Sequence, residues 1–133
     1  FKVYKGKSKD VLCEIIQKID KEKYSAVKIN KFIEKVKSSD TIISVCMTKD
    51  ESNRVPEWEE IAAVSMAVQN MWLSCYVNNI GSYWSTPALK EDYARHSNLN
   101  SNQKSLGFFF MGSYKHIETP KVREGLDSKV EWV

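Results

Sequence analysis

The sequence predicts a single domain that mixes helices and strands, and three observations carry this prediction. Apolar residues recur at helical spacing in residues 9–36. Two apolar runs, at 41–47 and 106–111, have the length of buried strands. A long segment between these runs reads as one uncharged helix. The length of 133 residues fits one domain, which we expect to span residues 1–133.

The composition is that of an ordinary globular protein. Hydrophobic residues make up 42% and charged residues 28% of the chain, a balance that excludes a disordered protein. The net charge of +3 is too small to indicate a nucleic acid or an anionic membrane as partner. The N-terminal residues 1–40 are rich in lysine, but acidic residues alternate with the lysines, which is typical of solvated helix faces.

The cysteines and histidines predict neither disulfides nor a metal site. Cys13, Cys46 and Cys75 are scattered in apolar runs, which is typical of reduced thiols in a reducing compartment. His96 and His116 are isolated and cannot complete a zinc site with them. Because the chain also shows no signal peptide, we expect a cytoplasmic protein.

The elements follow in order from the N-terminus. Residues 1–4 alternate as a short strand does, and Gly6 predicts a turn after them. Ser8 is a candidate cap for the amphipathic helix that follows it. Residues 27–36 predict a second helix, and the β-branched run at 41–47 predicts a strand inside a sheet.

The segment from Pro56 to Asn79 predicts the longest helix. Pro56 suits a first helical turn, and the glutamates that follow it suit the positive end of the helix dipole. Asn78, Asn79 and Gly81 form a stop signal. Apolar residues cover more than one side of the segment, so we expect a helix buried nearly all round.

The same helix raises the alternative of a membrane span, because its length would suffice. No charged residue occurs between Ile61 and Leu89, but six serine, asparagine and glutamine residues interrupt the apolar run, and no basic residue flanks it. We therefore favour a helix of the protein core and expect no membrane contact. One small domain hardly covers such a helix, so we expect a partner subunit on one side.

After the long helix, residues 82–87 predict a loop of hydroxyl and aromatic residues. Residues 88–96 predict a short helix, residues 97–104 a polar loop, 106–111 a second buried strand, and 113–133 a polar tail. The loop suits a flat polar ligand held by stacking and hydrogen bonds, although a purely structural loop has the same composition.

No familiar catalytic signature is present. The sequence lacks a P-loop, a dinucleotide-binding glycine motif, a nucleophile elbow and a zinc-protease motif. If the protein is an enzyme, its chemistry is therefore expected to lie in a bound cofactor.

Four segments in a specific order carry a resemblance to a known family. They are Val55–Glu60, Ala62–Met71, Ile80–Leu89 and Leu106–Gly112. Together they resemble the nitroreductase family of FMN-dependent NAD(P)H oxidoreductases, in its small single-domain form. The resemblance implies an α+β fold with a central, mainly antiparallel sheet flanked by helices. It also implies a homodimer with the long helix at the interface and FMN between the subunits.

The resemblance also implies a set of site residues. Trp84, Ser85 and Thr86 match the turn that contacts FMN, and Arg123, with Lys121 as second candidate, matches the basic residue that holds the FMN phosphate. The residues at the nicotinamide position are those at the end of the long helix: Ser74, Cys75, Tyr76, Val77, Asn78 and Asn79.

The implied activity passes a hydride from NAD(P)H through the flavin to a nitroaromatic, a quinone or a similar small electron-poor acceptor. It requires no side chain as catalytic group and no metal. Two departures support an alternative, a flavin-binding or structural homodimer without turnover. Ser85 and Pro87 stand where many small members have arginine and glycine, and the arginine-rich segment expected before Phe1 is absent from this chain. We expect that segment to belong to the natural protein.

Overall fold

The structure is a computed structural model that describes residues 1–20, 22–52, 54–115 and 124–133. Its elements in chain order are β1 (Lys2–Lys5), α1 (Ser8–Gln17), α2 (Ala26–Ser38), β2 (Thr41–Thr48), α3 (Glu57–Val77), β3 (Gly81–Ser85), α4 (Lys90–His96), β4 (Gln103–Gly112) and a 3₁₀ turn, η1 (Leu126–Ser128).

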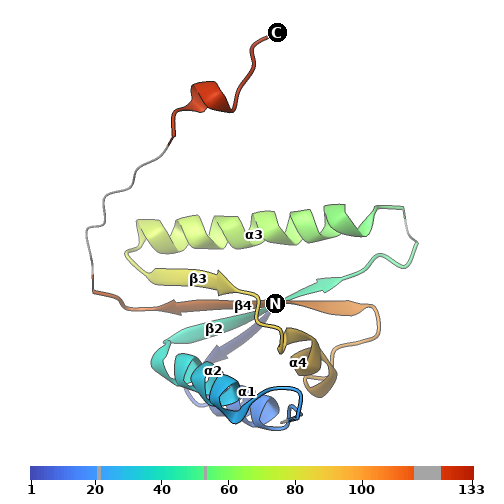
Figure 1. The fold of residues 1–133 in the computed structure, drawn as a ribbon, viewed down its shortest axis with the longest axis vertical. Helices are drawn as coiled ribbons and strands as arrows, with labels where there is room; N and C mark the ends of the chain where they lie inside the picture. Colours follow the sequence, from blue (N-terminus) through green and yellow to red (C-terminus); the bar gives the residue numbers. More distant parts are fainter. Residues whose placement is uncertain (21, 53, 116–123) are drawn as a thin grey trace.

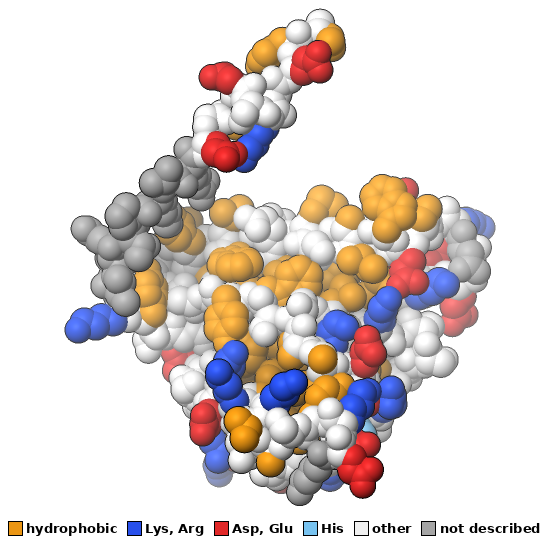
Figure 2. All heavy atoms as spheres, viewed as in Figure 1, with side chains coloured by type: hydrophobic (Ala, Val, Ile, Leu, Met, Phe, Trp, Pro, Cys, Tyr) orange, Lys and Arg blue, Asp and Glu red, His pale blue; other side chains and the backbone are white. Residues whose placement is uncertain are grey.

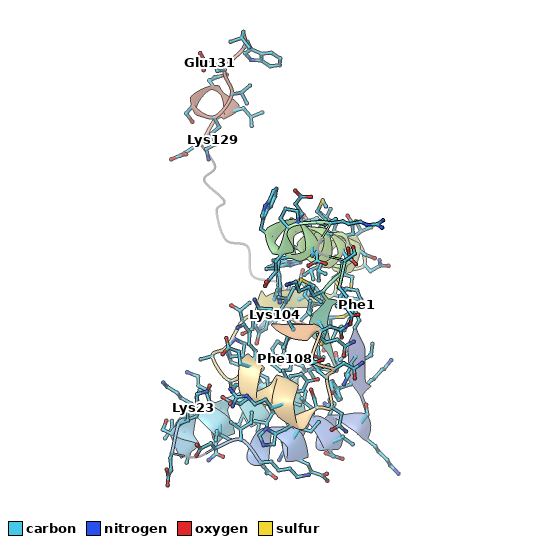
Figure 3. The ribbon with its side chains drawn as sticks, turned by 90° about the vertical axis from the view of Figure 1, so that its right-hand side faces the viewer. Phe1, Lys23, Lys104, Phe108, Lys129 and Glu131 are labelled. Carbon is cyan, nitrogen blue, oxygen red and sulfur yellow. The ribbon has the colours of Figure 1, made fainter. Side chains whose placement is uncertain are left out.

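The four strands form one antiparallel sheet between two helical layers. The strand order is β1-β2-β4-β3, and every neighbouring pair is antiparallel. Helix α3 lies along one face, whereas α1, α2 and α4 lie against the other (Figure 1). Seen edge-on, the sheet separates these two layers (Figure 3). The prediction of an α+β fold with an antiparallel sheet is confirmed.

The core between the sheet and helices α1, α2 and α4 centres on Phe108 of β4. The Phe108 ring meets Phe32 of α2 edge-on, with ring centroids 4.9 Å apart, and Tyr93 of α4 at 4.8 Å. The Tyr93 hydroxyl forms a buried hydrogen bond of 2.8 Å with the Tyr4 hydroxyl of β1. This one cluster therefore joins β1, β4, α2 and α4.

The opposite face of the sheet packs against α3. Phe109 of β4 and Val45 of β2 contact Val68 and Cys75 of α3 in a second buried cluster. Because Phe108 and Phe109 point to opposite faces and both faces are covered, the part of the strand from Leu106 to Met111 shows no alternation of apolar and polar residues.

Helix α3 is covered by the single chain on one side only. Val68 and Cys75 are the fully buried residues of this helix, 1% and 4% exposed. Large apolar side chains on the other side remain exposed: Trp58, Met66, Leu73, Tyr76 and Val77. Figure 2 shows hydrophobic side chains gathered over α3 and the adjoining part of the sheet, whereas most of the Lys and Arg side chains in this view lie lower. This exposure agrees with the expectation that one small domain hardly covers the helix, and burial of the other side by a partner subunit stays a prediction.

The prediction of a loop at residues 82–87 is wrong, since Gly81–Ser85 forms strand β3 at the edge of the sheet. Polar residues such as Ser82 and Ser85 are compatible with an edge strand, and pairing with β4 supplies the hydrogen bonds that fix the extended backbone. Strand β4 begins at Gln103, inside the polar loop predicted for 97–104.

Smaller predictions have mixed outcomes. Ser8 does not cap α1, because its hydroxyl bonds to the main chain of Lys5 instead. All three cysteines are free thiols. Among the described residues, the structure contains no helix that combines the length and the apolar character needed for a membrane span.

A buried carboxylate ties the α1–α2 connection to α4. The Asp92 side chain is 5% exposed and accepts hydrogen bonds from Lys23 Nζ and the Tyr24 hydroxyl, each at 2.7 Å. Arg95 Nη1 lies 2.8 Å from its other oxygen. The hydrogen bond from Lys23, followed by that from Tyr24, holds the pKa of Asp92 below its usual value of 3.8. Both carboxylate oxygens are thus satisfied, as a buried charge requires.

We expect Asp92→Asn to lower the free energy of unfolding by about 1–3 kcal/mol at neutral pH, because charge-assisted hydrogen bonds are lost. Urea unfolding measures this difference. The pKa of Asp92 is lower in the folded than in the unfolded protein, so its contribution is complete above the unfolded value and fades as the pH falls through the folded pKa. The gap between wild type and variant should therefore narrow on acidification. An equal difference in unfolding free energy between wild type and variant at neutral pH and at a pH below about 3 would contradict this role of the Asp92 carboxylate.

Candidate functional site

The end of α3 directs the chain toward the candidate site. Asn79 has a φ of 55°, the left-handed conformation that ends many helices. The Ile80 amide donates to the Cys75 carbonyl at 2.8 Å, and the Asn79 amide donates to the Tyr76 carbonyl at 3.1 Å. This pair of bonds is a Schellman motif, so the predicted stop signal is confirmed, with Asn79 in the position that glycine usually takes.

Strand β3 carries Trp84 and Ser85 along the edge of the sheet. The Trp84 ring is half-buried in the cluster between the sheet and α3, and its Nε1 donates to the Leu106 carbonyl at 3.1 Å. Because this N–H already has a partner inside the chain, Trp84 can offer a ligand its ring surface but not its donor. The neighbouring Tyr83 ring stacks on Phe110, with centroids 5.1 Å apart.

Ser85 and Thr86 lie where β3 ends and the chain turns toward α4. Ser85 is half-buried and Thr86 is exposed. Neither hydroxyl bonds to another residue in the described part of the chain, so both remain available to a ligand. The structure thus places the three predicted FMN-contacting residues together, on one strand end.

The electrostatic surroundings of this turn are mild. No charged side chain occurs in the stretch from Ile61 to Leu89, which includes most of α3 and all of β3. A cation does approach β3 from α2, where Lys35 Nζ lies 6.0 Å from the Tyr83 ring centroid. Partial burial raises the pKa of the Tyr83 hydroxyl above its usual value. Such a site suits an uncharged aromatic ring system better than an ionic substrate.

The other predicted site residues are less uniform. Tyr76 and Val77 are 69% and 77% exposed at the end of α3, whereas Cys75 is 4% exposed and packs against the sheet. The side-chain amide of Asn78 donates to the Ser74 carbonyl at 2.8 Å and so caps its own helix. Lys121 and Arg123, the candidates for a phosphate, lie outside the described residues, as does His116.

These features fit FMN in part. Two hydroxyls that have no partner within the described part of the chain, beside an uncharged, partly aromatic surface, match the hydrogen-bonding edge and the flat ring of a flavin. A phosphate would need cations or a helix N-terminus, and the basic candidates are the two residues outside the described chain. Within the described residues, no cluster of metal-ligating side chains is found.

A β-bulge in β4, which was not predicted from the sequence, lies next to this turn. The register between β2 and β4 shifts at Val45 and Cys46, which pair with Gly107 and Ser105. Leu106 is the extra residue of this β-bulge, and Gly107 has a φ of 112°. The single glycine inside an apolar strand was the available signal, since isolated strand glycines often mark bulges.

Comparison with known proteins is decisive for the family. A family model described as the nitroreductase family matches residues 8–113, which is most of the chain. The chain belongs to the nitroreductase family. No curated protein matches this chain at a significant level.

Solved structures agree with this assignment at the level of the fold. The nitroreductase-like family protein from Bacillus cereus superposes with a TM-score of 0.84 at 21% identity, over 99% of this chain and 71% of that chain. A mutant of the FMN- and NADPH-dependent nitroreductase NfnB from Sphigopyxis sp. strain HMH gives a TM-score of 0.64 at 12% identity, over 98% and 77%. At these identities the likeness shows a common nitroreductase fold.

Two buried serines near the bulge give a matched pair for a stability test. Ser105 is 2% exposed and its Oγ has no hydrogen-bond partner among the described residues, whereas Ser44, fully buried, lies 3.4 Å from Cys46 Sγ. We expect Ser105→Ala to leave the free energy of unfolding unchanged or to raise it, because an unpaired buried hydroxyl is removed. Ser44→Ala should lower it by about 0.5–1 kcal/mol. Urea unfolding of both variants measures the difference, and a larger loss in Ser105→Ala would contradict this interpretation.

Proposed function

We propose that the protein is an FMN-dependent oxidoreductase that uses NAD(P)H to reduce nitroaromatics, quinones or similar small electron-poor acceptors. Family membership supports the reaction class, and FMN and NADPH dependence is stated for one protein of the same fold. The observation that carries the proposal is the turn after β3, where two hydroxyls with no hydrogen-bond partner among the described residues lie beside the Trp84 ring. When bound, FMN supplies the redox chemistry by accepting a hydride and returning electrons to the acceptor.

The side chains then act by binding and orientation. Ser85 and Thr86 donate or accept hydrogen bonds at the polar edge of the flavin, and Trp84 supports their turn from the core side. Arg123, with Lys121 as second candidate, supplies the positive charge for the FMN phosphate. The stretch of chain from Ile61 to Leu89, which includes the turn, brings no charged side chain of its own to the ring system.

We further propose that nicotinamide approaches the exposed end of α3. Ser74, Tyr76 and Val77 are exposed there, as are the Asn78 and Asn79 that end the helix. Cys75 is left out of this set, because its side chain is buried against the sheet and does not reach the surface.

A homodimer is the third part of the proposal. The exposed side of α3 is apolar and lacks lysine, arginine and acidic residues from Ile61 onward, which is unusual for a solvated helix face. The C-terminal segment 124–133 lies apart from the body and exposes Leu126 and Trp132, 74% and 92% (Figure 1). A second copy that covers these surfaces would bury them and bring a second subunit beside the turn after β3.

The first test is the visible absorption spectrum of the purified natural protein, before and after NADPH is added under nitrogen. We expect a flavin band that bleaches, because hydride transfer from NADPH reduces the bound cofactor. Subsequent addition of a quinone should restore the band, and steady-state kinetics should give parallel lines, since donor and acceptor use one pocket in turn.

Two other outcomes would contradict this function in different ways. A flavin band that resists both NADPH and NADH would indicate a flavin-binding protein without turnover. A protein that stays colourless in excess FMN would indicate a structural role.

Ser85→Ala combined with Thr86→Val should raise the Kd for FMN by about tenfold, since each lost hydrogen bond costs roughly 0.5–1.5 kcal/mol.

The dimer has a separate test. We expect Met66→Glu to weaken self-association at least about hundredfold, because a carboxylate would be buried in an apolar interface. Sedimentation equilibrium measures the dissociation constant. Val27→Glu is the matched control, since Val27 is also exposed and apolar but lies on α2, on the far side of the sheet. Equal behaviour of the two variants would place the interface elsewhere.

A further inference from the structure

The bulge in β4 lies directly beneath the turn that carries Ser85 and Thr86. Strand β3 pairs with β4 as far as Ser85, which lies opposite Phe108. The next residue of β4 toward its start is Gly107, followed by the unpaired Leu106. The last pair between β3 and β4 therefore ends where the bulge begins.

The bulge provides a first connection to the turn through Leu106. As the extra residue of the bulge, Leu106 has no partner on β2. Its carbonyl accepts the 3.1 Å hydrogen bond from Trp84 Nε1. Trp84, which precedes Ser85, is thus hydrogen-bonded to Leu106, which precedes Gly107.

Gly107 provides the second connection, through close backbone contact. A Cβ at this position would overlap the Ser85 carbonyl oxygen and would lie 3.2 Å from both the Ser85 carbonyl carbon and Thr86 Cα. The atoms that it would meet are main-chain atoms, which cannot move aside as the end of a side chain does. The φ of 112° is in addition a conformation that residues with a side chain rarely adopt.

No other described glycine combines these two properties. Gly6 has a φ of 56°, but a Cβ added there would have no atom within 4 Å. Gly125 has neither a positive φ nor a neighbour within that distance. The conformation of Gly107 is therefore matched to one neighbour, the segment Ser85–Thr86.

We propose that the bulge at Leu106 and Gly107 supports the cofactor-binding turn and fixes its position, and that Gly107 is a positioning residue for this turn. This inference rests on the proposed role of Ser85 and Thr86 toward FMN. Gly107 touches no ligand itself. Because Gly107 has no side chain, the turn can approach β4 closely, and this approach sets the positions of the Ser85 and Thr86 hydroxyls. The hydrogen bond from Trp84 Nε1 to the Leu106 carbonyl holds the end of β3 against β4.

A purely structural role for Gly107 makes a different prediction. In that case a side chain at 107 would lower stability but leave the folded protein with an unchanged flavin site. The positioning role requires the site itself to change in protein that remains folded, because a displacement of about 1 Å is enough to weaken a binding geometry.

The experiment compares Gly107→Ala with Gly6→Ala and Gly125→Ala in the full natural protein. Each variant is titrated with FMN below its own melting temperature, and the Kd and the visible circular dichroism of bound flavin are recorded. Hydrogen exchange of the flavin-free protein over residues 84–89 gives a readout independent of the cofactor. Gly6→Ala controls for the cost of a left-handed residue, and Gly125→Ala controls for the substitution itself.

We expect Gly107→Ala to raise the Kd for FMN about tenfold or more, to change the flavin dichroism and to speed exchange over 84–89. Gly6→Ala should lose stability alone, and Gly125→Ala should match wild type. A folded Gly107→Ala variant with wild-type Kd, dichroism and exchange overturns the inference.

Trp84→Phe keeps the experiment decisive if Gly107→Ala does not fold. It removes the donor to Leu106 but keeps an aromatic ring in the cluster under α3. Faster exchange over 84–89 and weaker FMN binding support the inference, and wild-type values for both overturn it. Wild-type protein that binds no FMN is a separate result, because it overturns the proposed function. The hydrogen-exchange data over residues 84–89 then decide whether the bulge positions the turn.

Discussion

Pairing between β2 and β4 is the constraint on which the rest of the structure depends. The two strands are joined from Thr41 and Met111 to Thr48 and Gln103, and they form the middle of the sheet. Each face of β4 carries large aromatic rings, so each face needs its own cover: Phe108 and Phe110 pack against α2 and α4, whereas Phe109 packs against α3. Burial of aromatic surface on both sides is the main stabilising term that holds the helical layers in place.

The irregularity in this pairing is also where the candidate site is built. A regular ladder would have used the Leu106 carbonyl, and a residue with a side chain at 107 would have kept Ser85 at a greater distance. At the bulge, part of the regular strand pairing is lost, and the turn after β3 can approach β4 closely. Binding sites held on strand ends by backbone contacts are more rigid than sites on free loops, which suits a protein whose side chains have to orient a cofactor.

The two helical layers differ in chemistry, and this difference has consequences for assembly. The layer of α1, α2 and α4 presents lysines and acids to solvent and fixes its own connections with ion pairs such as those of Asp92 (Figure 2). Helix α3 presents an uncharged apolar side instead. The surface that remains to be covered is therefore on the same side of the sheet as the partly buried Trp84, so cover of α3 and completion of the site are linked in the proposed dimer.

Much of this protein follows from local sequence. Helical spacing of apolar residues located α1, α2 and α3, the asparagines after Val77 stopped α3, and the uncharged apolar runs located β2 and β4, because these signals act over a few neighbouring residues. The motifs between Val55 and Gly112 also identified the family and brought attention to Trp84, Ser85 and Thr86. Tertiary contacts decided the remainder. Residues 81–85 form a strand because β4 offers them an edge for pairing. The Trp84 N–H donates to the carbonyl of Leu106, the extra residue of the bulge. Each of these outcomes depends on residues far apart in the chain, which no local pattern records.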